Sequence, residues 1–284
     1  MSHIAETRRL NGSVLKALSV LDAFGPQRDQ LNGSQLAEIT GLSRGSLYPI
    51  IHSLETGGYL QRVAPRTYSV GFRVVELANV VLRRLDIQES VRPALQRLAS
   101  TLKVNAHLGV LNGHDALHLY REIGADAVVV GEIVGWQAPA YCTALGKVLL
   151  AHLPGRELDA FLASAVLVPH TPTTITNATQ LADEIRSIAE IGHAVSQEEY
   201  HEGVVGIAAA VRDAQGVVCC AISVSVTKPR FDREERTLVD AVRQAAASIS
   251  DQLRLRTMVA SASSQTDWLR QIAREKKEEH HNGT

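Results

Sequence analysis

Residues 43–58 of the chain, SRGSLYPIIHSLETGG, begin with short polar side chains and one cation. The apolar residues that follow recur at helical spacing, which predicts a helix. Small residues at a helix N-terminus let the backbone approach DNA closely, and the free N–H groups there attract phosphate. Tyr48 and His52 lie four residues apart and share one face. The segment therefore predicts a recognition helix for the major groove of DNA, with contacts from Ser43, Arg44, Gly45, Ser46, Tyr48 and His52.

Pro49 lies inside this predicted helix. A proline there removes one backbone hydrogen bond and costs roughly 3 kcal/mol in an ordinary helix. We expect it to bend or narrow the helix, so that Ser46 and Tyr48 approach the duplex. A surface helix of an ordinary domain is the alternative interpretation of the same pattern.

The neighbouring segments favour the DNA-binding interpretation. SQLAEIT, at residues 34–40, predicts a partner helix, and residues 60–71 predict two short strands around an Ala-Pro-Arg turn. Together with a first helix over 12–24, these elements make a winged helix-turn-helix. They add the candidate DNA contacts Ser34, Gln35, Arg62 and Arg66.

The charge of the chain is divided unevenly. Residues 1–75 hold eight Lys and Arg against five Asp and Glu, a net charge of +3, and the other residues hold 21 basic against 25 acidic side chains, or −4. A basic head on an acidic body suits a small DNA-binding module joined to another domain. The three cysteines form no disulfide framework, the N-terminus does not read as a signal peptide, and no apolar run approaches the ~20 residues of a membrane span. We therefore expect a cytoplasmic protein.

The length of 284 residues predicts two domains. In the second half, strand patterns alternate with helical patterns and short turns, which predicts an α+β domain with one antiparallel sheet covered by helices. The predicted strands are 105–111, 115–123, 128–134, 193–197, 206–213 and 217–226, and the predicted helices are 90–102, 143–153, 181–191 and 233–255. We expect a winged helix-turn-helix domain over residues 10–72, a linker helix over 73–88, the second domain over 89–256, and a polar tail, a frayed helix or disordered, over 257–284.

Candidates for catalysis or metal binding in the second domain are incomplete sets. Cys142 has no evident His–Asp partner, and Lys147 is better explained as a solvated or ion-paired residue than as a catalytic amine. Glu198 and Glu199 are adjacent, so in a strand they point to opposite faces. His107, His114 and His118 could be metal ligands, but a metal site would need a Cys or Asp to complete the ligand set. The sequence therefore predicts no enzyme, no cofactor and no metal.

Several stretches of the chain follow one another in a familiar order. The head contains GSVLKALSVLDAF, LAEITGLSRGSLYPIIHSLETGGYL and YSVGFRVVELA, and the second domain contains APAYCTALGKVLLA and GHAVSQEEYHEGVVGIAAAVRDAQGVVCCAISVS. In order and spacing, residues 12–253 resemble the IclR family of bacterial transcriptional regulators. Gly146-Lys147, Glu199 and Gly203-Val204 meet the family pattern. The chain departs from it at Pro49, where members commonly have arginine, and at Gly206, where many have cysteine.

The resemblance implies a transcriptional regulator with a GAF-like or profilin-like effector domain that binds a small carboxylate. The family pattern places the effector pocket at Thr143, Ala144, Leu145, Ser196, Gln197, Gly206, Ser223 and Ser225. Ser223 and Ser225 are two apart, so their hydroxyls share one face of a strand, and Thr143 opens a helix whose free N–H groups suit an anion. We expect the apolar body of the ligand to lie among Leu145, Val211 and Ile222. The alternative interpretation is that these two serines simply alternate on a half-exposed strand and do not line a pocket.

A dimer or a dimer of dimers on a palindromic operator is expected, because one small head makes few phosphate contacts. Without a basic residue deep in the pocket, we favour a weakly polar or aromatic acid as the effector. Two other functions stay open at this point. Leu-Tyr-Pro at residues 47–49 also resembles the recognition helix of PadR-type regulators, in which case the second domain only dimerises. The second open function is an enzyme that acts on a small carboxylate.

Overall fold

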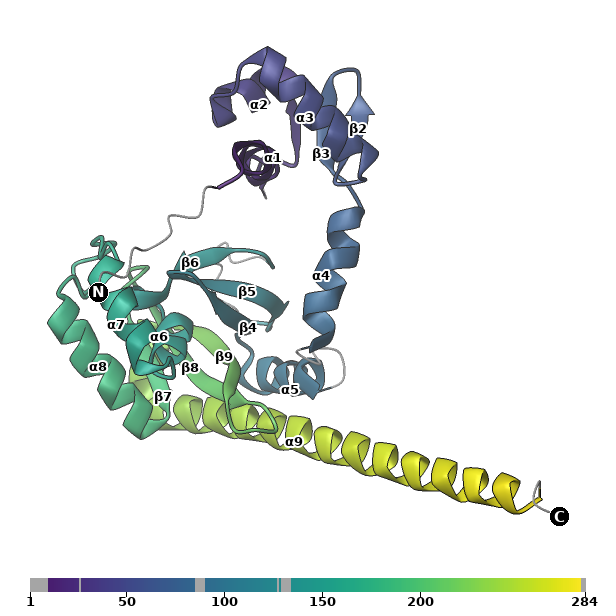
Figure 1. Cartoon of the computed structure of the whole chain (residues 1–284). Coiled ribbons are helices and arrows are strands. Elements are labelled where there is room, and N and C mark those ends of the chain that lie inside the picture. Colours follow the sequence, from purple (N-terminus) through teal and green to yellow (C-terminus); the bar gives the residue numbers. More distant parts are fainter. Residues whose placement is uncertain (1–9, 26, 85–89, 127, 129–133, 282–284) are drawn as a thin grey trace, which may run out of the picture. The chain divides into compact units, whose positions relative to one another are not determined.

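The protein is described by a computed structural model that covers residues 10–25, 27–84, 90–126, 128 and 134–281, with the side chains of these residues except 83–84 and 256–281. The chain divides into two compact units, residues 1–84 and 85–284 (Figure 1). The contacts within each unit define its fold. No helix in the described part of the chain is both long enough and apolar enough to cross a membrane.

Unit 1 is a winged helix-turn-helix, as the sequence predicts. A three-stranded antiparallel sheet in the order β1-β3-β2 accompanies three helices, and a fourth helix, α4, follows. Leu36, Leu47 and Ile51 from two of the helices pack with Leu60 and Tyr68 from the sheet to form the core. The elements are α1 Gly12–Asp22, β1 Gln30–Asn32, α2 Gly33–Thr40, α3 Arg44–Thr56, β2 Leu60–Ala64, β3 Thr67–Val70 and α4 Arg73–Arg84.

The helix-turn-helix itself is set by local sequence signals. Asn32 caps α2 through bonds from the N–H groups of Ser34 and Gln35, while the Gln35 side chain accepts from the Asn32 N–H, so the two form a capping box. Gly41 ends α2 in the left-handed conformation, with φ 68°, which a side chain would disfavour. The chain therefore turns at once into α3.

Helix α3 is continuous through Pro49. The missing N–H of Pro49 leaves the carbonyl of Gly45 without its usual helical donor. Gly45 is exposed, and a Cβ built there would meet nothing within 4 Å, so water can reach this carbonyl. The cost of the proline is therefore reduced at this position, because the freed acceptor is not buried.

Unit 2 is an α+β domain, also as predicted. Six strands form one antiparallel sheet in the order β6-β5-β4-β9-β8-β7. Figure 1 shows α6, α7 and α8 on one side of this sheet and α5 and α9 on the other. The elements are α5 Arg92–Leu102, β4 Asn105–Asn112, β5 Asp115–Glu122, β6 Gln137–Pro139, the 3₁₀ turn η2 Ala140–Cys142, α6 Ala144–Leu150, α7 Gly155–Ser164, α8 Ala178–Ile191, β7 His193–Gln197, β8 Val204–Arg212, β9 Val218–Thr227 and α9 Lys228–His281.

Three parts of unit 2 differ from the sequence prediction. The short strand β6 and helix α7 were not predicted. The strand predicted at 128–134 lies mostly outside the described residues and stays a prediction. Helix α9 starts five residues before the predicted helix and continues to His281, through the segment expected as a frayed or disordered tail. Its only proline, Pro229, is in the first turn, where no helical hydrogen bond is lost, and glycine returns only at Gly283.

Candidate functional site

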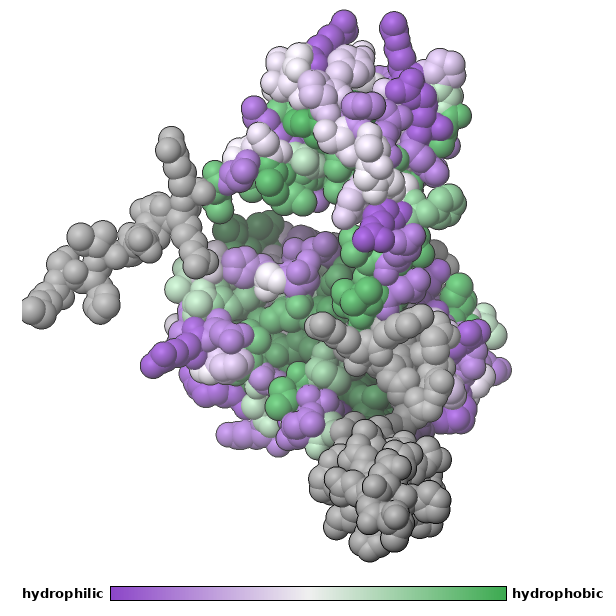
Figure 2. Space-filling model, turned by 45° about the vertical axis from the view of Figure 1, so that its right-hand side comes forward, coloured by the Kyte–Doolittle hydropathy of each residue, from purple (hydrophilic) through white to green (hydrophobic). Residues whose placement is uncertain are grey.

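The predicted DNA contacts of unit 1 gather on α2, α3 and the β2–β3 hairpin. All are exposed except Ser46, which is half-buried and lies 3.3 Å from the hydroxyl of Ser43. Hydrophilic side chains project from the visible face of this unit (Figure 2). Arg44 is the first residue of α3, so its cation lies at the end of the helix whose N–H groups favour phosphate.

Tyr48 connects the two helices of the motif. Its hydroxyl lies so close to Gly33, the first residue of α2, that a Cβ at Gly33 would be 2.9 Å away from it. Tyr48 nevertheless keeps 42% of its surface exposed. The ring therefore packs over the start of α2 and still presents one side to solvent.

The two arginines of the wing have different surroundings. Arg62 forms an ion pair with Glu55 of α3 at 3.2 Å, and its guanidinium lies 5.4 Å from the centre of the Tyr68 ring. This pair ties the wing to α3. Arg66 is exposed in the turn between β2 and β3 with φ 62°, and its carbonyl accepts from the N–H of Gly33. Among the described side chains, Arg66 is thus the wing cation that forms no ion pair.

Unit 2 contains a cavity of about 50 Å³ between α6 and the sheet, which is room for about one or two water molecules. It includes seven of the eight residues that the family resemblance placed at the pocket. The full lining is His118, Cys142, Thr143, Ala144, Leu145, Ser196, Tyr200, His201, Val204, Gly206, Ser223, Val224 and Ser225.

The start of α6 forms one wall of the cavity. Thr143 caps this helix: its hydroxyl accepts from the Gly146 N–H at 3.2 Å and donates to the Pro139 carbonyl at 3.1 Å. The first two N–H groups of α6, those of Ala144 and Leu145, have no acceptor within the helix. Gly206 faces them, since a Cβ there would lie 3.8 Å from the Ala144 nitrogen and 3.2 Å from its Cβ. The glycine therefore keeps this end of the cavity open.

Three serines on the sheet face the same cavity. Ser196 and Ser225 both pair with Gly206 across the strands, and Ser223 lies two residues before Ser225 on β9. All three are buried. The Ser196 hydroxyl donates to the Cys142 carbonyl at 2.8 Å and so fixes the turn that precedes α6. Ser223 and Ser225 supply hydroxyls to the interior.

Three predicted pocket residues point elsewhere. Gln197 is exposed, because it follows Ser196 on β7 and takes the opposite face. Val211 and Ile222 are buried, but strand alternation places them on the face opposite Ser223 and Gly206, which α9 covers. The expected apolar lining from Val211 and Ile222 is therefore wrong, and that from Leu145 is present.

His118 lines the cavity and was not among the predicted pocket residues. It is buried on β5, opposite Gly109 of β4, and its ring centre lies 5.1 Å from those of His107 and Trp136. Its alternation with Ala116 on β5 was the sequence signal that could have placed it inside. The described residues contain no cluster of three or more His, Cys, Asp or Glu that could hold a metal.

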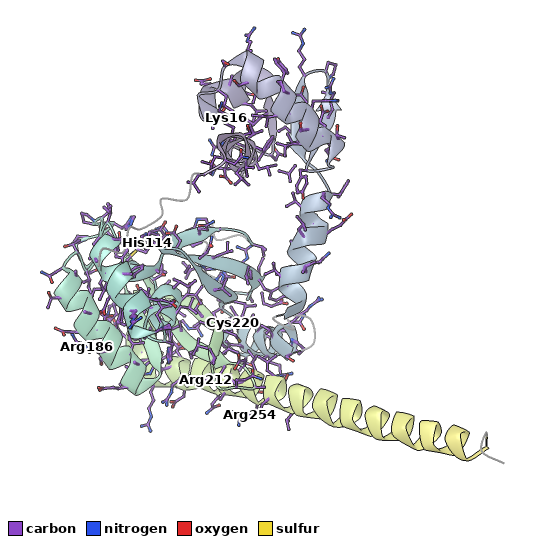
Figure 3. The ribbon with its side chains drawn as sticks, viewed as in Figure 1. Lys16, His114, Arg186, Arg212, Cys220 and Arg254 are labelled. Atoms are coloured by element: carbon purple, nitrogen blue, oxygen red, sulfur yellow. The ribbon has the colours of Figure 1, made fainter. Side chains whose placement is uncertain are left out.

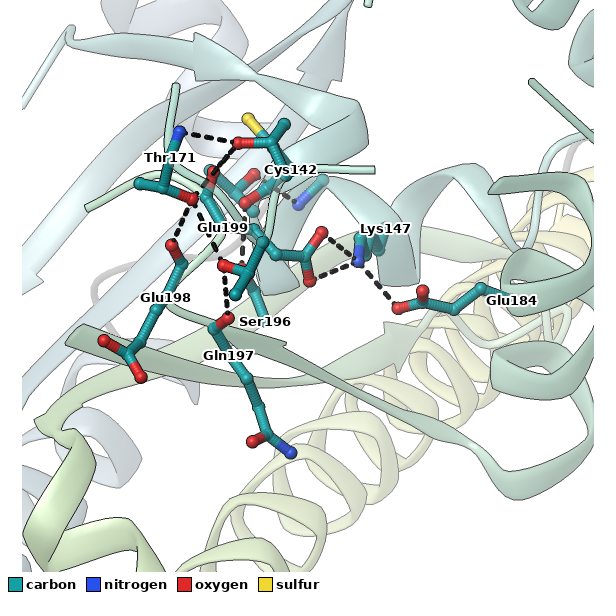
Figure 4. A network of polar contacts seen from close by, with 12 residues as sticks. Cys142, Lys147, Thr171, Glu184, Ser196, Gln197, Glu198 and Glu199 are labelled. Carbon is teal, nitrogen blue, oxygen red and sulfur yellow. Dashed lines mark hydrogen bonds and ion pairs between the residues drawn. The ribbon is translucent and has the colours of Figure 1, made fainter. Parts of the chain in front are cut away.

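A largely buried ionic network lies next to residues that line the cavity, and Figure 4 shows its contacts. The Lys147 ammonium of α6 has no exposed surface and lies 2.6 Å from a carboxylate oxygen of Glu199 and 2.6 Å from one of Glu184. Burial raises the pKa of Glu199 to about 7, against the opposing attraction of Lys147. Thr171 and Thr174 donate to the carbonyls of residues 198 and 199, which holds the segment in place. Of the two expected roles for Lys147, ion pairing is the one observed.

Comparison with known proteins assigns both units. The IclR helix-turn-helix model matches residues 13–64, and the model of the C-terminal part of the bacterial transcriptional regulator IclR matches residues 79–251. The chain belongs to the IclR family. The HTH-type transcriptional regulator XynR of Escherichia coli (strain K12) is 30% identical over 224 residues, which are 78% of this chain and 89% of XynR.

Solved structures share the fold of this IclR-family regulator. The IclR of Thermotoga maritima is 27% identical with a TM-score of 0.66, over 85% of this chain and 98% of that one. An IclR homolog from Microbacterium hydrocarbonoxydans, solved in complex with 4-hydroxybenzoate, is 23% identical with a TM-score of 0.77, over 86% and 99%.

The family membership decides between the functions left open by the sequence. The matched relatives are HTH-type transcriptional regulators, not enzymes. The match over residues 79–251 assigns the second unit to the IclR family and not to a PadR-like dimerisation domain. Cys142 fits this conclusion, because burial raises the pKa of its thiol to about 12 and leaves almost no thiolate to act as a nucleophile.

Proposed function

We propose that this regulator binds a palindromic operator as a dimer or a dimer of dimers in the cytoplasm, and that a small organic carboxylate in the unit 2 cavity controls this binding. The cavity carries the proposal. It brings the start of α6 and buried hydroxyls from two strands together around one hollow. Such a mixture of an apolar wall and a few convergent polar groups is typical of a small-molecule site.

The carboxylate would be held at the α6 end of the cavity. The N–H groups of Ala144 and Leu145 offer hydrogen bonds to its oxygens, and Ser225 adds a hydroxyl from the sheet. His118 offers an imidazole to a second polar group of the ligand. The relative solved with 4-hydroxybenzoate has the same fold, and this acid carries both a carboxylate and a second polar group.

The operator would be bound by α3 in the major groove, with Arg66 of the wing on the backbone. Arg44→Ala should weaken operator binding and lower the salt dependence of binding by about one released counterion. The same variant should leave the affinity for the acid unchanged. Equal losses of both affinities would contradict two separate sites.

Self-association is supported by exposed apolar side chains on α4 and at the residue directly before it. Phe72, Val75 and Val80 are 75%, 56% and 58% exposed. Exposed apolar side chains that recur along one helix mark interaction surfaces. Sedimentation of the full chain should give at least a dimer, and a monomer at operator-binding concentrations would overturn this part.

The effector is tested by thermal unfolding with a panel of organic acids that includes 4-hydroxybenzoate, followed by a mobility shift with DNA from upstream of the protein's own gene. One acid should raise the melting temperature and change the shift, and Ser225→Ala should reduce both effects. Gln197→Ala, on the exposed side of β7, is the matched control and should behave as wild type. Specific DNA binding that no acid alters would overturn the effector site and leave the DNA-binding function standing.

A further inference from the structure

Two neighbouring cysteines lie side by side at one end of β9. Adjacent residues in a regular strand point to opposite faces, so their sulfurs would be separated by the sheet. Here the pairing of β8 with β9 shifts: Val211 pairs with Cys220, but Arg212 pairs with Val218, which leaves Cys219 as an extra residue. This β-bulge breaks the alternation. The Sγ atoms of Cys219 and Cys220 lie 3.8 Å apart.

The two thiols differ in access. Cys220 is fully buried, and Cys219 is half-buried, so a reagent reaches Cys219 first. Cys219 also contacts the carbonyl of Val211 through its sulfur at 3.6 Å. A hydrogen bond from the Cys220 thiol lowers the pKa of Cys219, while the same bond raises that of Cys220. The accessible sulfur is therefore the one with the larger thiolate fraction.

A direct disulfide is a poor fit for this pair. Its sulfurs would have to approach to about 2.05 Å, and disulfides usually join Cα atoms about 4.4–6.8 Å apart. Consecutive Cα atoms are only about 3.8 Å apart. The strand would have to be rebuilt to form the bond. A single atom bonded to both sulfurs needs a much smaller adjustment of the observed 3.8 Å separation.

We propose that Cys219 and Cys220 form a dithiol site for trivalent arsenicals that carry one organic substituent. Soft thiolates select soft centres. A structural zinc ion needs four ligands, whereas no group of three His, Cys, Asp or Glu occurs among the described residues. An arsenical with one organic group needs only two further bonds, and these two sulfurs supply them. The proposal does not depend on the carboxylate effector.

The reaction balances without an oxidant. An arsenoxide reacts with the two thiols, two As–S bonds form, and the oxygen leaves with both thiol protons as one water molecule. Arsenic stays trivalent. The site lies where the sheet meets α9, since the N–H of Arg212 donates to the Ser250 hydroxyl at 3.0 Å; Figure 3 labels Arg212 and Cys220. Binding there is thus separate from the cavity, which neither cysteine lines.

The test adds one equivalent of phenylarsine oxide to the reduced, folded full-length protein and measures intact mass. Wild type and Cys142→Ser should each gain one phenylarsenic group, and an excess of a small dithiol should remove it. Cys219→Ser and Cys220→Ser should each lose the adduct. Because Cys220 is buried, circular dichroism must show that its variant folds; if it does not, the half-buried Cys219→Ser decides.

Three outcomes would overturn the site. Wild type could gain no phenylarsenic group, the adduct could persist in Cys219→Ser, or it could depend on Cys142. Hydrogen peroxide provides an independent comparison on the same sample. Loss of two hydrogens on peroxide treatment, without uptake of the arsenical, would mean a redox pair instead of a dithiol site and would contradict the proposal.

Discussion

The ammonium of Lys147 lies 2.6 Å from Oε2 of Glu199, and both side chains are buried although 52 residues separate them in the chain. Lys147 belongs to α6, whose first residues form the wall of the cavity. Tyr200, the neighbour of Glu199, also lines the cavity. The ion pair therefore joins two segments that both line the candidate effector site.

Removal of this ammonium should destabilise unit 2 strongly. Lys147→Met leaves Glu199 buried without its cation, and breaking a buried pair in this way costs about 3–5 kcal/mol. Chemical denaturation of the full chain measures the loss. Glu184→Gln is the control, because Glu184 is 30% exposed and water can replace much of its contact, so a clearly smaller loss is expected. Equal losses of stability in the two variants would contradict a dominant contribution from the Lys147–Glu199 pair.

Burial of the Glu199 carboxylate should also make stability depend on pH. Burial raises the pKa of Glu199 from 4.5 to about 7, so the folded state holds this proton more tightly than the unfolded state does. The resulting stabilisation is complete below about pH 4.5 and is lost as the pH rises through about 7, by roughly 3 kcal/mol at most. Glu199→Gln removes the titration. The free energy of unfolding of wild type minus that of the variant should fall between about pH 4.5 and 7, and a difference that rises with pH would contradict the raised pKa.

Filling the cavity should separate ligand binding from DNA binding. A Cβ at Gly206 would lie 3.2 Å from that of Ala144 and 3.9 Å from that of Ser196, so Gly206→Val pushes its methyl groups into the cavity. The stabilisation by the effector acid should be lost, with Kd raised at least about tenfold, or about 1.4 kcal/mol. Operator binding without the acid should stay as in wild type. Gln197→Val, on the exposed side of the neighbouring strand, is the matched control.

The elements of both units follow from local patterns, because apolar spacing and capping residues act within a few positions. The capping box at Asn32 and Gln35 and the alternation around Ser223 are signals of this kind. What the sequence could not show depends on partners far along the chain. The face that Val211 occupies is decided by the pairing of β8 with β9 and by α9, which covers that side.

This dependence on distant partners also explains two clusters. Sequence reasoning predicted a solvated or ion-paired Lys147 without its partner Glu199, and it missed the contact between Cys219 and Cys220. Lys147 stands in an apolar helix, which is itself a signal of a buried pair, but nothing local indicates Glu199 as its partner. Strand alternation by itself would place Cys219 and Cys220 on opposite faces, and only the register shift against β8 brings their sulfurs together. A bulge is a property of two strands, so one strand's residues do not reveal it.

The contact between Gly33 and Tyr48 offers a test of the recognition surface. Gly33→Ala would place a Cβ 2.9 Å from the Tyr48 hydroxyl and 3.3 Å from its Cζ, so the ring has to move away from the start of α2. Since Tyr48 lies on the face of α3 that we assign to DNA, operator affinity should fall by about tenfold, or about 1.4 kcal/mol. Stability should change little, because Tyr48 is 42% exposed and can swing toward solvent.

The double variant decides whether Tyr48 transmits this effect. Tyr48→Ala removes the ring, so adding Gly33→Ala to it should cost no further operator affinity, a non-additivity that a double-mutant cycle measures. Independent losses at the two positions would mean that Gly33→Ala acts through the backbone of α2 instead. Ser53→Ala, farther along α3 and exposed, controls for general effects on the helix, and it should bind the operator as wild type does.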